Sequence, residues 1–213
     1  MTLSMKEIRA EVLESGGKTP LLRVKELGER FPSSIALRNK EFGIWNEISY
    51  SEFWNRCTHV ASALKNFGVN KGDKVAVHSE NRPEWFISDL GIQAAGAVTV
   101  GLYPTNPKSE VEYLLGHSET VIVFAEDQEQ VDKALAVLEN LPSLKKIVYF
   151  DDKGMYKYDS DYLISFEEFI KIGKESLNSN LESILQTIEN IDDDDLALLV
   201  YTSGTTGPPK GSM

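Results

Sequence analysis

The chain has one cysteine, Cys57, among its 213 residues, and no apolar run of the roughly 18 to 20 residues that a membrane-spanning helix needs. A single cysteine excludes a disulfide within the chain and agrees with a reducing compartment, so we expect a cytoplasmic location. The first residues carry no apolar segment of the kind found in signal peptides. The sequence therefore predicts neither a transmembrane segment nor a secretory leader.

Positive charge is also scarce. The chain has 22 Lys and Arg against 33 Asp and Glu, which gives a formal net charge of −11 at pH 7. Proteins that bind nucleic acid neutralise phosphates with Lys and Arg, so this balance predicts no nucleic-acid partner. Two lysine pairs, Lys71 with Lys74 and Lys145 with Lys146, are too small a basic patch for an anionic membrane surface. An anionic ligand such as ATP therefore needs positive potential that is supplied locally.

Histidine occurs only at His59, His78 and His117, and no two of them have the spacing of paired metal ligands. We expect structural roles for all three, with catalysis as the less favoured alternative. Cys57 lies on the apolar face of a predicted helix, so a buried, unreactive thiol is favoured over a nucleophile. The acidic run 192–195 is interpreted as a solvated turn rather than a metal site. No metal ligand is predicted among these residues.

Short apolar strands alternate with amphipathic helices along most of the chain. Strands are predicted at 35–37, 45–48, 73–78, 98–102, 121–124, 147–150 and 196–201, and helices from Ser49 or Ser51 to Gly68, at 84–95, around 111–115, around 131–138 and at 166–188. Asn178 is a candidate break in the last helix, and residues 151–161 are predicted to form a surface excursion. The alternation predicts an α/β fold with largely parallel sheets flanked by helices on both faces.

The final strand leads into a segment rich in hydroxyls and glycines, which we call the Gly/Thr segment: Thr202-Ser203-Gly204-Thr205-Thr206-Gly207-Pro208-Pro209-Lys210-Gly211. Glycines let the backbone approach a ligand closely, and successive amides form an anion-binding concavity. The two prolines have no N–H to donate, so the amide donors come mainly from residues 203–207, and Lys210 adds a positive charge. The segment predicts a phosphate-binding loop, with a Gly/Thr-rich surface turn as the alternative.

The Gly/Thr segment does not have the spacing of the Walker A loop, in which four residues separate a glycine from Gly-Lys-Ser/Thr. Counted from Gly204, the second glycine would fall on Pro209, and counted from Gly207 it would fall on Ser212. This mismatch argues against a nucleotide-binding module with kinase-like phosphoryl transfer.

The run from Tyr201 to Gly211 resembles the phosphate-binding signature of the adenylate-forming (AMP-binding) superfamily, which includes acyl-CoA synthetases, peptide-synthetase adenylation domains and firefly luciferases. Four upstream blocks resemble long-chain fatty acid–CoA ligases in order and spacing: residues 72–77, 80–85, 94–98 and 103–107. The resemblance covers residues 35–211, and Ser212 departs from it, since the family more often has an apolar branched residue there.

The resemblance implies that the chain is the N-terminal part of the large domain of such an enzyme. It divides the chain into a lead-in segment (1–34), an α/β subdomain of the AMP-binding N-terminal domain (35–190), and a strand plus phosphate-binding loop of the next, truncated subdomain (191–213). The family reaction uses ATP to convert a carboxylic acid, here a long-chain fatty acid, into an acyl-adenylate, and then transfers the acyl group to coenzyme A. The implied ATP-binding residues are Thr202, Ser203, Gly204, Thr205, Thr206, Gly207 and Lys210, with Lys210 as the catalytic residue.

The resemblance also places the glutamate that helps to hold magnesium (Mg2+), the ribose-binding aspartate and the lysine of the small C-terminal domain beyond Met213. We therefore expect the 213 residues alone to be inactive. We also expect that the chain can self-associate through an uncovered apolar edge and that the parent enzyme can contact a membrane peripherally. Two alternatives stay open at this point: a non-catalytic regulatory or interaction fragment, and an adenylating enzyme for an amino or aryl acid.

Overall fold

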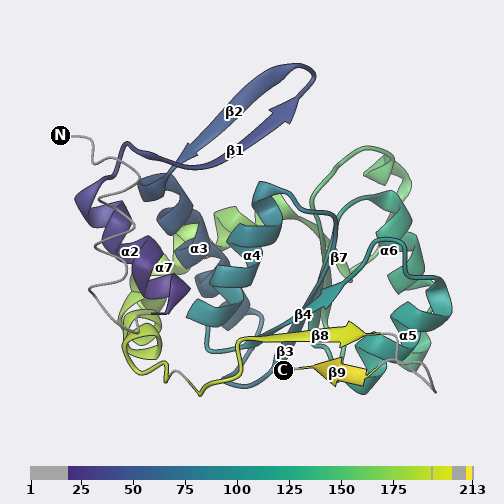
Figure 1. The fold of residues 1–213 in the computed structure, drawn as a ribbon. Helices are drawn as coiled ribbons and strands as arrows, with labels where there is room; N and C mark the ends of the chain where they lie inside the picture. The colour runs from purple at the N-terminus through teal and green to yellow at the C-terminus, as the bar shows by residue number, and fades with distance from the viewer. Residues whose placement is uncertain (1–18, 193, 203–209, 213) are drawn as a thin grey trace.

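The computed structural model describes residues 19–192, 194–202 and 210–212. Its centre is a seven-stranded sheet in the order β7-β6-β5-β3-β4-β8-β9 (Figure 1). The strands are β3 (Lys74–His78), β4 (Val98–Leu102), β5 (Ile122–Ala125), β6 (Lys146–Tyr149), β7 (Leu163–Ser165), β8 (Leu198–Thr202) and β9 (Lys210–Ser212). Every neighbouring pair from β7 to β8 is parallel, whereas β9 pairs with β8 in the antiparallel direction.

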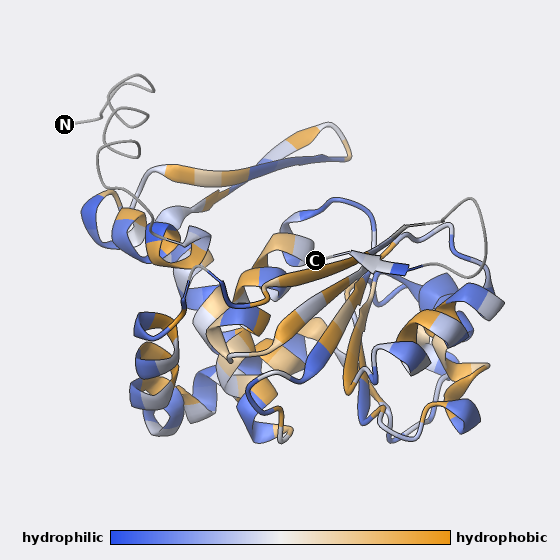
Figure 2. Ribbon diagram, turned by 60° about the horizontal axis from the view of Figure 1, so that its bottom comes forward, coloured by the Kyte–Doolittle hydropathy of each residue, from blue (hydrophilic) through white to orange (hydrophobic). Residues whose placement is uncertain are grey.

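Helices cover both faces of this sheet. One face carries α2 (Pro20–Arg30), α3 (Tyr50–Asn66), α4 (Pro83–Ala94) and α7 (Phe166–Glu189), and the other carries α5 (Lys108–His117) and α6 (Gln128–Leu135). The sheet separates two hydrophobic core clusters, the first beneath α2, α3, α4 and α7 and the second beneath α5 and α6. Side chains of one strand alternate between them, since Val75 and Val77 belong to the first cluster and Ala76 to the second. Figure 2 shows the apolar strands between the two helix layers. The predicted fold class is confirmed.

Local chemistry explains where the helices begin and end. The Ser49 hydroxyl accepts a hydrogen bond from the Glu52 amide at 3.2 Å and so caps α3, and Ser165 caps α7 in the same way through Glu168. Gly68 follows α3 with a φ of 72°, the left-handed conformation that commonly ends a helix. Predictions for the start of α3 and its glycine end are confirmed.

Three features differ from the sequence-based expectation. α7 is one continuous helix, so the candidate break near Asn178 is wrong. It is also not a membrane span, because none of the helices in the described ranges is both long and apolar enough to cross a membrane. The predicted surface excursion after β6 includes a short 3-10 helix, η2 (Met155–Lys157), in which Met155 is buried, and it leads into the unpredicted edge strand β7. The last predicted strand begins at residue 198 rather than 196, and β9 was not expected.

The hairpin of β1 (Ile35–Glu41) and β2 (Ile44–Ser49) projects from the body of the molecule (Figure 1). Phe42 and Gly43 form its turn with positive φ angles of 48° and 84°, as a two-residue hairpin turn requires. The Phe42 side chain is 87% exposed, and the Lys153 ammonium lies 5.6 Å from the centre of its ring. The tip of the hairpin therefore touches the loop after β6.

The predicted domain boundaries fall on identifiable points of this fold. Within the described residues, the lead-in segment contains α2, whose Leu21 and Val24 belong to the first core cluster. The boundary before residue 191 falls between α7 and β8, and β8 lies beside β4 in the same sheet as the rest of the α/β part. The division into separate subdomains stays a prediction.

Helices α3 and α7 approach each other closely along a small and polar seam. The Ser62 and Ser176 hydroxyls are hydrogen-bonded at 2.9 Å, and the Asn180 amide donates to the Ser62 Oγ at 3.0 Å. A Cβ placed on Gly173 would lie 1.8 Å from the backbone oxygen of His59. Only glycine permits this spacing, so Gly173 sets the distance between the two helices.

Cys57 is fully buried in the first core cluster, as predicted, and burial raises the pKa of its thiol well above the usual value. Because the thiolate is the reactive form, we expect a thiol reagent to label the native chain slowly and the chain in denaturant rapidly. Cys57→Ala should leave nucleotide binding unchanged. Rapid stoichiometric labelling of the native chain that ATP suppresses would show instead that the thiol faces a nucleotide site.

Candidate functional site

The polar motifs of this chain follow strands that end at one edge of the sheet. Since β3, β4, β5 and β8 are parallel neighbours, their carboxyl ends lie together. Residues 79–82 follow β3, residues 103–107 follow β4, and the Gly/Thr segment follows β8. Open α/β sheets bind ligands at their carboxyl edge, where connections leave toward opposite faces. Here the connection after β3 leads to α4 on one face, and the connection after β4 leads to α5 on the other.

The predicted ATP-binding residues lie partly within the described part of the chain. Thr202 is the last residue of β8, Lys210 is the first of β9, and the two are direct partners across the antiparallel pair. Ser203, Gly204, Thr205, Thr206 and Gly207 lie outside the described residues. Lys210 is exposed at this edge of the sheet. The structure therefore brings the two ends of the Gly/Thr segment together, and the roles of its residues stay predictions.

His117 makes a contact at this site that the sequence did not reveal. Its Nδ1 and the Tyr201 hydroxyl are hydrogen-bonded at 2.9 Å, and the two rings meet edge to face with centroids 5.8 Å apart. Tyr201 is only 6% exposed, and burial raises the pKa of its hydroxyl, followed by a smaller effect of Tyr113. No pattern in the sequence could have joined these residues, because 84 positions separate them.

Three side chains, those of His78, Gln130 and Lys133, are hydrogen-bonded to backbone oxygens of the loop after β4. His78 Nε2 lies 3.1 Å from the Tyr103 carbonyl oxygen and must donate to it, which leaves Nδ1 as a buried acceptor without a partner among the described residues. The Pro104 oxygen accepts from Gln130 Nε2 at 3.2 Å and from Lys133 Nζ at 2.8 Å. Residues 103–107, one of the blocks that carried the resemblance, are thus fixed by β3 and α6.

His78 makes the stability of the chain depend on pH. Burial, followed by repulsion from Lys133, lowers the pKa of the His78 imidazole to about 4 from an ordinary value near 6.5. A lowered pKa means that only the unfolded chain takes up the proton between these values, so stability is fully present above pH 6.5 and falls as the pH drops toward 4. The loss from this one group is about 3 kcal/mol.

His78→Gln, which keeps an N–H donor for the Tyr103 oxygen, should remove this dependence. Urea unfolding from pH 8 to pH 4 should give a curve for the variant that is flatter than the wild-type curve by about 2–3 kcal/mol over the range. Parallel curves for the two proteins would show that His78 is accessible to protons in the folded state.

Arg82 joins the connections that follow β3 and β5. Its Nε donates to Glu84 at 2.6 Å, and its NH1 lies 3.8 Å from Glu126, whose other carboxylate oxygen accepts from the Glu80 amide at 2.8 Å. The guanidinium carbon lies 5.4 Å from the centre of the Phe150 ring. The helix predicted at 84–95 is observed as α4, which begins at Pro83, and Arg82 occupies its N-cap position without a side-chain capping bond.

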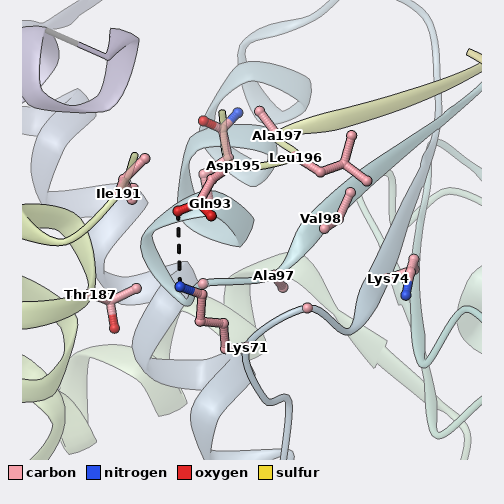
Figure 3. A pocket seen from close by; sticks show the side chains of 12 residues that line it. Lys71, Lys74, Gln93, Ala97, Val98, Thr187, Ile191, Asp195, Leu196 and Ala197 are labelled. Atoms are coloured by element: carbon pink, nitrogen blue, oxygen red, sulfur yellow. Dashed lines mark ion pairs between the residues drawn. The ribbon is translucent and has the colours of Figure 1, made fainter. Parts of the chain in front are cut away.

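A pocket of about 290 Å³ lies at the opposite, amino edge of the sheet (Figure 3). It is lined by Lys71, Gly72, Lys74, Gln93, Gly96, Ala97, Val98, Thr187, Ile191, Asp195, Leu196 and Ala197. Lys74, Val98 and Leu198 begin β3, β4 and β8, so these strands of about 3.3 Å per residue separate the pocket from the carboxyl edge by roughly 15 Å. The pocket is therefore distinct from the site at which the Gly/Thr segment begins.

The described residues of the acidic run, Asp192, Asp194 and Asp195, make the contacts of a turn before β8, as predicted. The Asp192 amide donates to Asp195 Oδ2 at 3.1 Å, the Asp194 amide donates to Asp192 Oδ1 at 3.0 Å, and Asp195 lies 3.9 Å from the Lys71 ammonium. Within the ranges that the structure describes, no group of three or more His, Cys, Asp or Glu residues could hold a metal ion.

Comparison with protein families decides the identity of this fold. The family model described as AMP-binding enzyme matches residues 24–213, which is nearly the whole chain. The chain belongs to the AMP-binding enzyme family. Its predicted resemblance to the adenylate-forming superfamily is confirmed.

Relatives of this AMP-binding family member include the long-chain-fatty-acid–CoA ligase ACSBG2 of Xenopus laevis, 32% identical over 89% of this chain, and the long-chain-fatty-acid–CoA ligase ACSBG1 of Homo sapiens, 31% identical over 87%. The chain spans about a quarter of the length of each, since the matches cover 25% of both. The names of these relatives support the assignment of this chain to the acyl-CoA ligases of the family. The identity of the acid substrate is proposed below.

Solved structures give the same fold. The anthranilate CoA ligase AuaEII, solved in complex with anthranoyl-AMP, superposes with a TM-score of 0.68 at 26% identity and covers 88% of this chain and 33% of its own. The acetoacetyl-CoA synthetase of Streptomyces lividans superposes with a TM-score of 0.69 at 19% identity, over 90% of this chain and 29% of its own, which shows the fold alone.

Proposed function

We propose that this chain carries the ATP phosphate-binding part of an AMP-forming ligase that activates a long-chain fatty acid and passes the acyl group to coenzyme A. The observation that carries the proposal is the pairing of Thr202 with Lys210 at the carboxyl edge, which joins both ends of the Gly/Thr segment in a member of the AMP-binding enzyme family. The names of the relatives, long-chain-fatty-acid–CoA ligases, support the choice of acid.

In this proposal the Gly/Thr segment holds the β- and γ-phosphates of ATP while the acid's carboxylate attacks the α-phosphorus. Pyrophosphate leaves, and its growing negative charge needs donors that are already in position. The hydroxyls of Thr202, Ser203, Thr205 and Thr206 donate to phosphate oxygens, and Gly204 and Gly207 let the backbone approach. Lys210 supplies the positive charge, and each such charge-assisted contact is worth about 1.5–3 kcal/mol. Magnesium would share the phosphate charge, with its carboxylate ligand expected downstream.

The choice of acid is tested in the complete protein that contains this chain. Acid-dependent exchange of pyrophosphate into ATP should be measured for acids of two to eighteen carbons and for anthranilate, because a neighbour of this fold is an anthranilate CoA ligase. We expect the highest kcat/KM for long-chain acids. A preference for acetate, an amino acid or an aryl acid would overturn the proposed substrate and leave the adenylation chemistry in place.

We further propose that the 213 residues alone bind ATP weakly and do not catalyse, since the match to this chain covers only 25% of each relative with the ligase name. The three strand residues Leu198 to Val200 are only partly buried, and Leu196 is 37% exposed, so this strand offers apolar surface for further chain or for a second copy. Calorimetry should give a dissociation constant for ATP of roughly 1 mM or weaker. Micromolar binding or any acid-dependent exchange by the isolated chain would contradict this.

A further inference from the structure

Strand β8 leaves the parallel sheet before it ends. Its pairing with β4 runs from Leu198 opposite Thr99 to Val200 opposite Gly101, and the last described partner on β4 is that glycine. Tyr201 and Thr202 pair only with Gly211 and Lys210 of β9 among the described residues. β9 has three residues, all exposed, and lies at the outer edge of the sheet (Figure 1). Backbone pairing therefore joins β9 to β8, but it does not join the end of β8 to the rest of the parallel sheet.

The Tyr201 side chain supplies the missing connection. Its ring is buried in the second core cluster, beneath α5, and its hydroxyl is hydrogen-bonded to Nδ1 of His117 at the end of that helix. Tyr113, one turn earlier on α5, packs beside His117 with the two ring centres 5.3 Å apart. Across β8, a Cβ on Gly211 would meet the Tyr201 ring at an ordinary contact distance of 3.5 Å. Tyr201 is thus linked to α5 by its side chain and to β9 by its pairing with Gly211.

We propose that His117 and Tyr201 are a positioning pair that fixes the end of β8 against α5. The pair sets where Thr202 lies and, through the pairing of Thr202 with Lys210, where Lys210 lies. The effect of this pair on ATP binding rests on the proposed function, in which the Gly/Thr segment binds ATP. The geometric part, a strand end held against α5 by the buried Tyr201 ring and its hydrogen bond to His117, stands without it.

The geometric part is tested on the 213-residue chain without nucleotide. Tyr201→Phe keeps the buried ring and removes only the hydroxyl. Since a single hydrogen bond of this kind contributes about 1 kcal/mol, amide hydrogen exchange at residues 201–202 and 210–212 should become about three- to tenfold faster, with β3 unchanged. His117→Phe should have the same local effect. Tyr113→Phe is the matched control on the same helix and should leave these amides unchanged.

Equal exchange in wild type and Tyr201→Phe would overturn the positioning role, whatever the enzyme does with ATP. Faster exchange throughout the sheet, including β3, would also overturn it, because the hydroxyl would then support the fold as a whole rather than the strand end. A complete enzyme that fails to form an adenylate would overturn the proposed function and leave this measurement standing.

The consequence for ATP is tested in the complete protein by pyrophosphate exchange. Tyr201→Phe and His117→Phe should each raise the KM for ATP by about three- to tenfold and leave the KM for the acid within twofold. The double variant should be no worse than either single variant, because both remove the same bond. His117→Gln, which retains a polar group that reaches the hydroxyl, should recover part of the loss. Equal effects on both KM values, or additive losses, would overturn the pair as a positioning device for ATP.

Discussion

Lys210→Ala in the complete enzyme should lower the rate of acyl-adenylate formation by about tenfold to a hundredfold, which corresponds to about 1.4–2.8 kcal/mol. Lys210 begins β9 directly opposite Thr202 and is exposed at the carboxyl edge of the sheet. The chain has a net charge of −11, so the positive charge that ATP needs must come from particular residues. In the proposed reaction, loss of this ammonium would leave the departing pyrophosphate with one fewer charge-assisted donor.

The matched control is Lys71→Ala. Lys71 is also exposed, and it lies at the amino edge beside the pocket of Figure 3, where its ammonium is 3.9 Å from Asp195. An exposed ion pair of this kind contributes little, so exchange by this variant should stay within twofold of wild type. If Lys210→Ala also stays within twofold, Lys210 has no catalytic role and the proposed use of the Gly/Thr segment is wrong.

Gly173→Ala should destabilise the chain by about 3 kcal/mol, at the upper end of the usual range for overpacking. The new methyl group would lie 1.8 Å from the His59 carbonyl oxygen and 3.1 Å from the Ala63 amide nitrogen, both backbone atoms of α3. A backbone atom cannot rotate aside as a side chain can, so α3 and α7 must separate. The Ser62–Ser176 hydrogen bond spans the same seam and would lengthen with it.

Thermal unfolding measures this effect, and the melting temperature should fall by roughly 6–12 °C for a domain of this size. Gly116→Ala is the matched control, because Gly116 is also helical and its added Cβ would meet only a side-chain carbon of Leu141 at 3.7 Å. Alanine favours helices over glycine, so that variant should be as stable as wild type or more stable by up to about 1 kcal/mol. A Gly173→Ala chain of wild-type stability would mean that the two helices can move apart at little cost.

Much of the fold could be predicted from local chemistry. Ser49 and Gly68 mark the ends of α3 by capping and by a left-handed conformation, and the bounds predicted for β4 are those observed. These elements are specified within a few residues of the chain. The break predicted near Asn178 is wrong because Ser176 and Asn180, the polar residues on either side of it in α7, contact Ser62 of α3. These two polar side chains form hydrogen bonds with a residue more than 110 positions away in the sequence.

The candidate site also combines features that a local motif can predict with features that depend on contacts between distant residues. The Gly/Thr segment is a contiguous motif, so the sequence alone predicts phosphate binding and a role for Lys210, and both stay predictions. His117 gave no such signal, because its link to Tyr201 depends on α5 packing under the sheet beside β8. His78 was expected to be structural, and its hydrogen bond to the Tyr103 oxygen agrees with that expectation. Contacts between distant residues thus account for what the sequence could not predict.

We propose that the complete protein activates a carboxylic acid by transfer of an adenylyl group. The most direct measurement is the identity of the nucleotide product when the complete protein is incubated with ATP, magnesium, a long-chain fatty acid and coenzyme A. We expect AMP and pyrophosphate in amounts equal to the acyl-CoA formed, with neither produced when the acid is left out. ADP and inorganic phosphate as the products, or ATP consumption that does not depend on an acid, would contradict it.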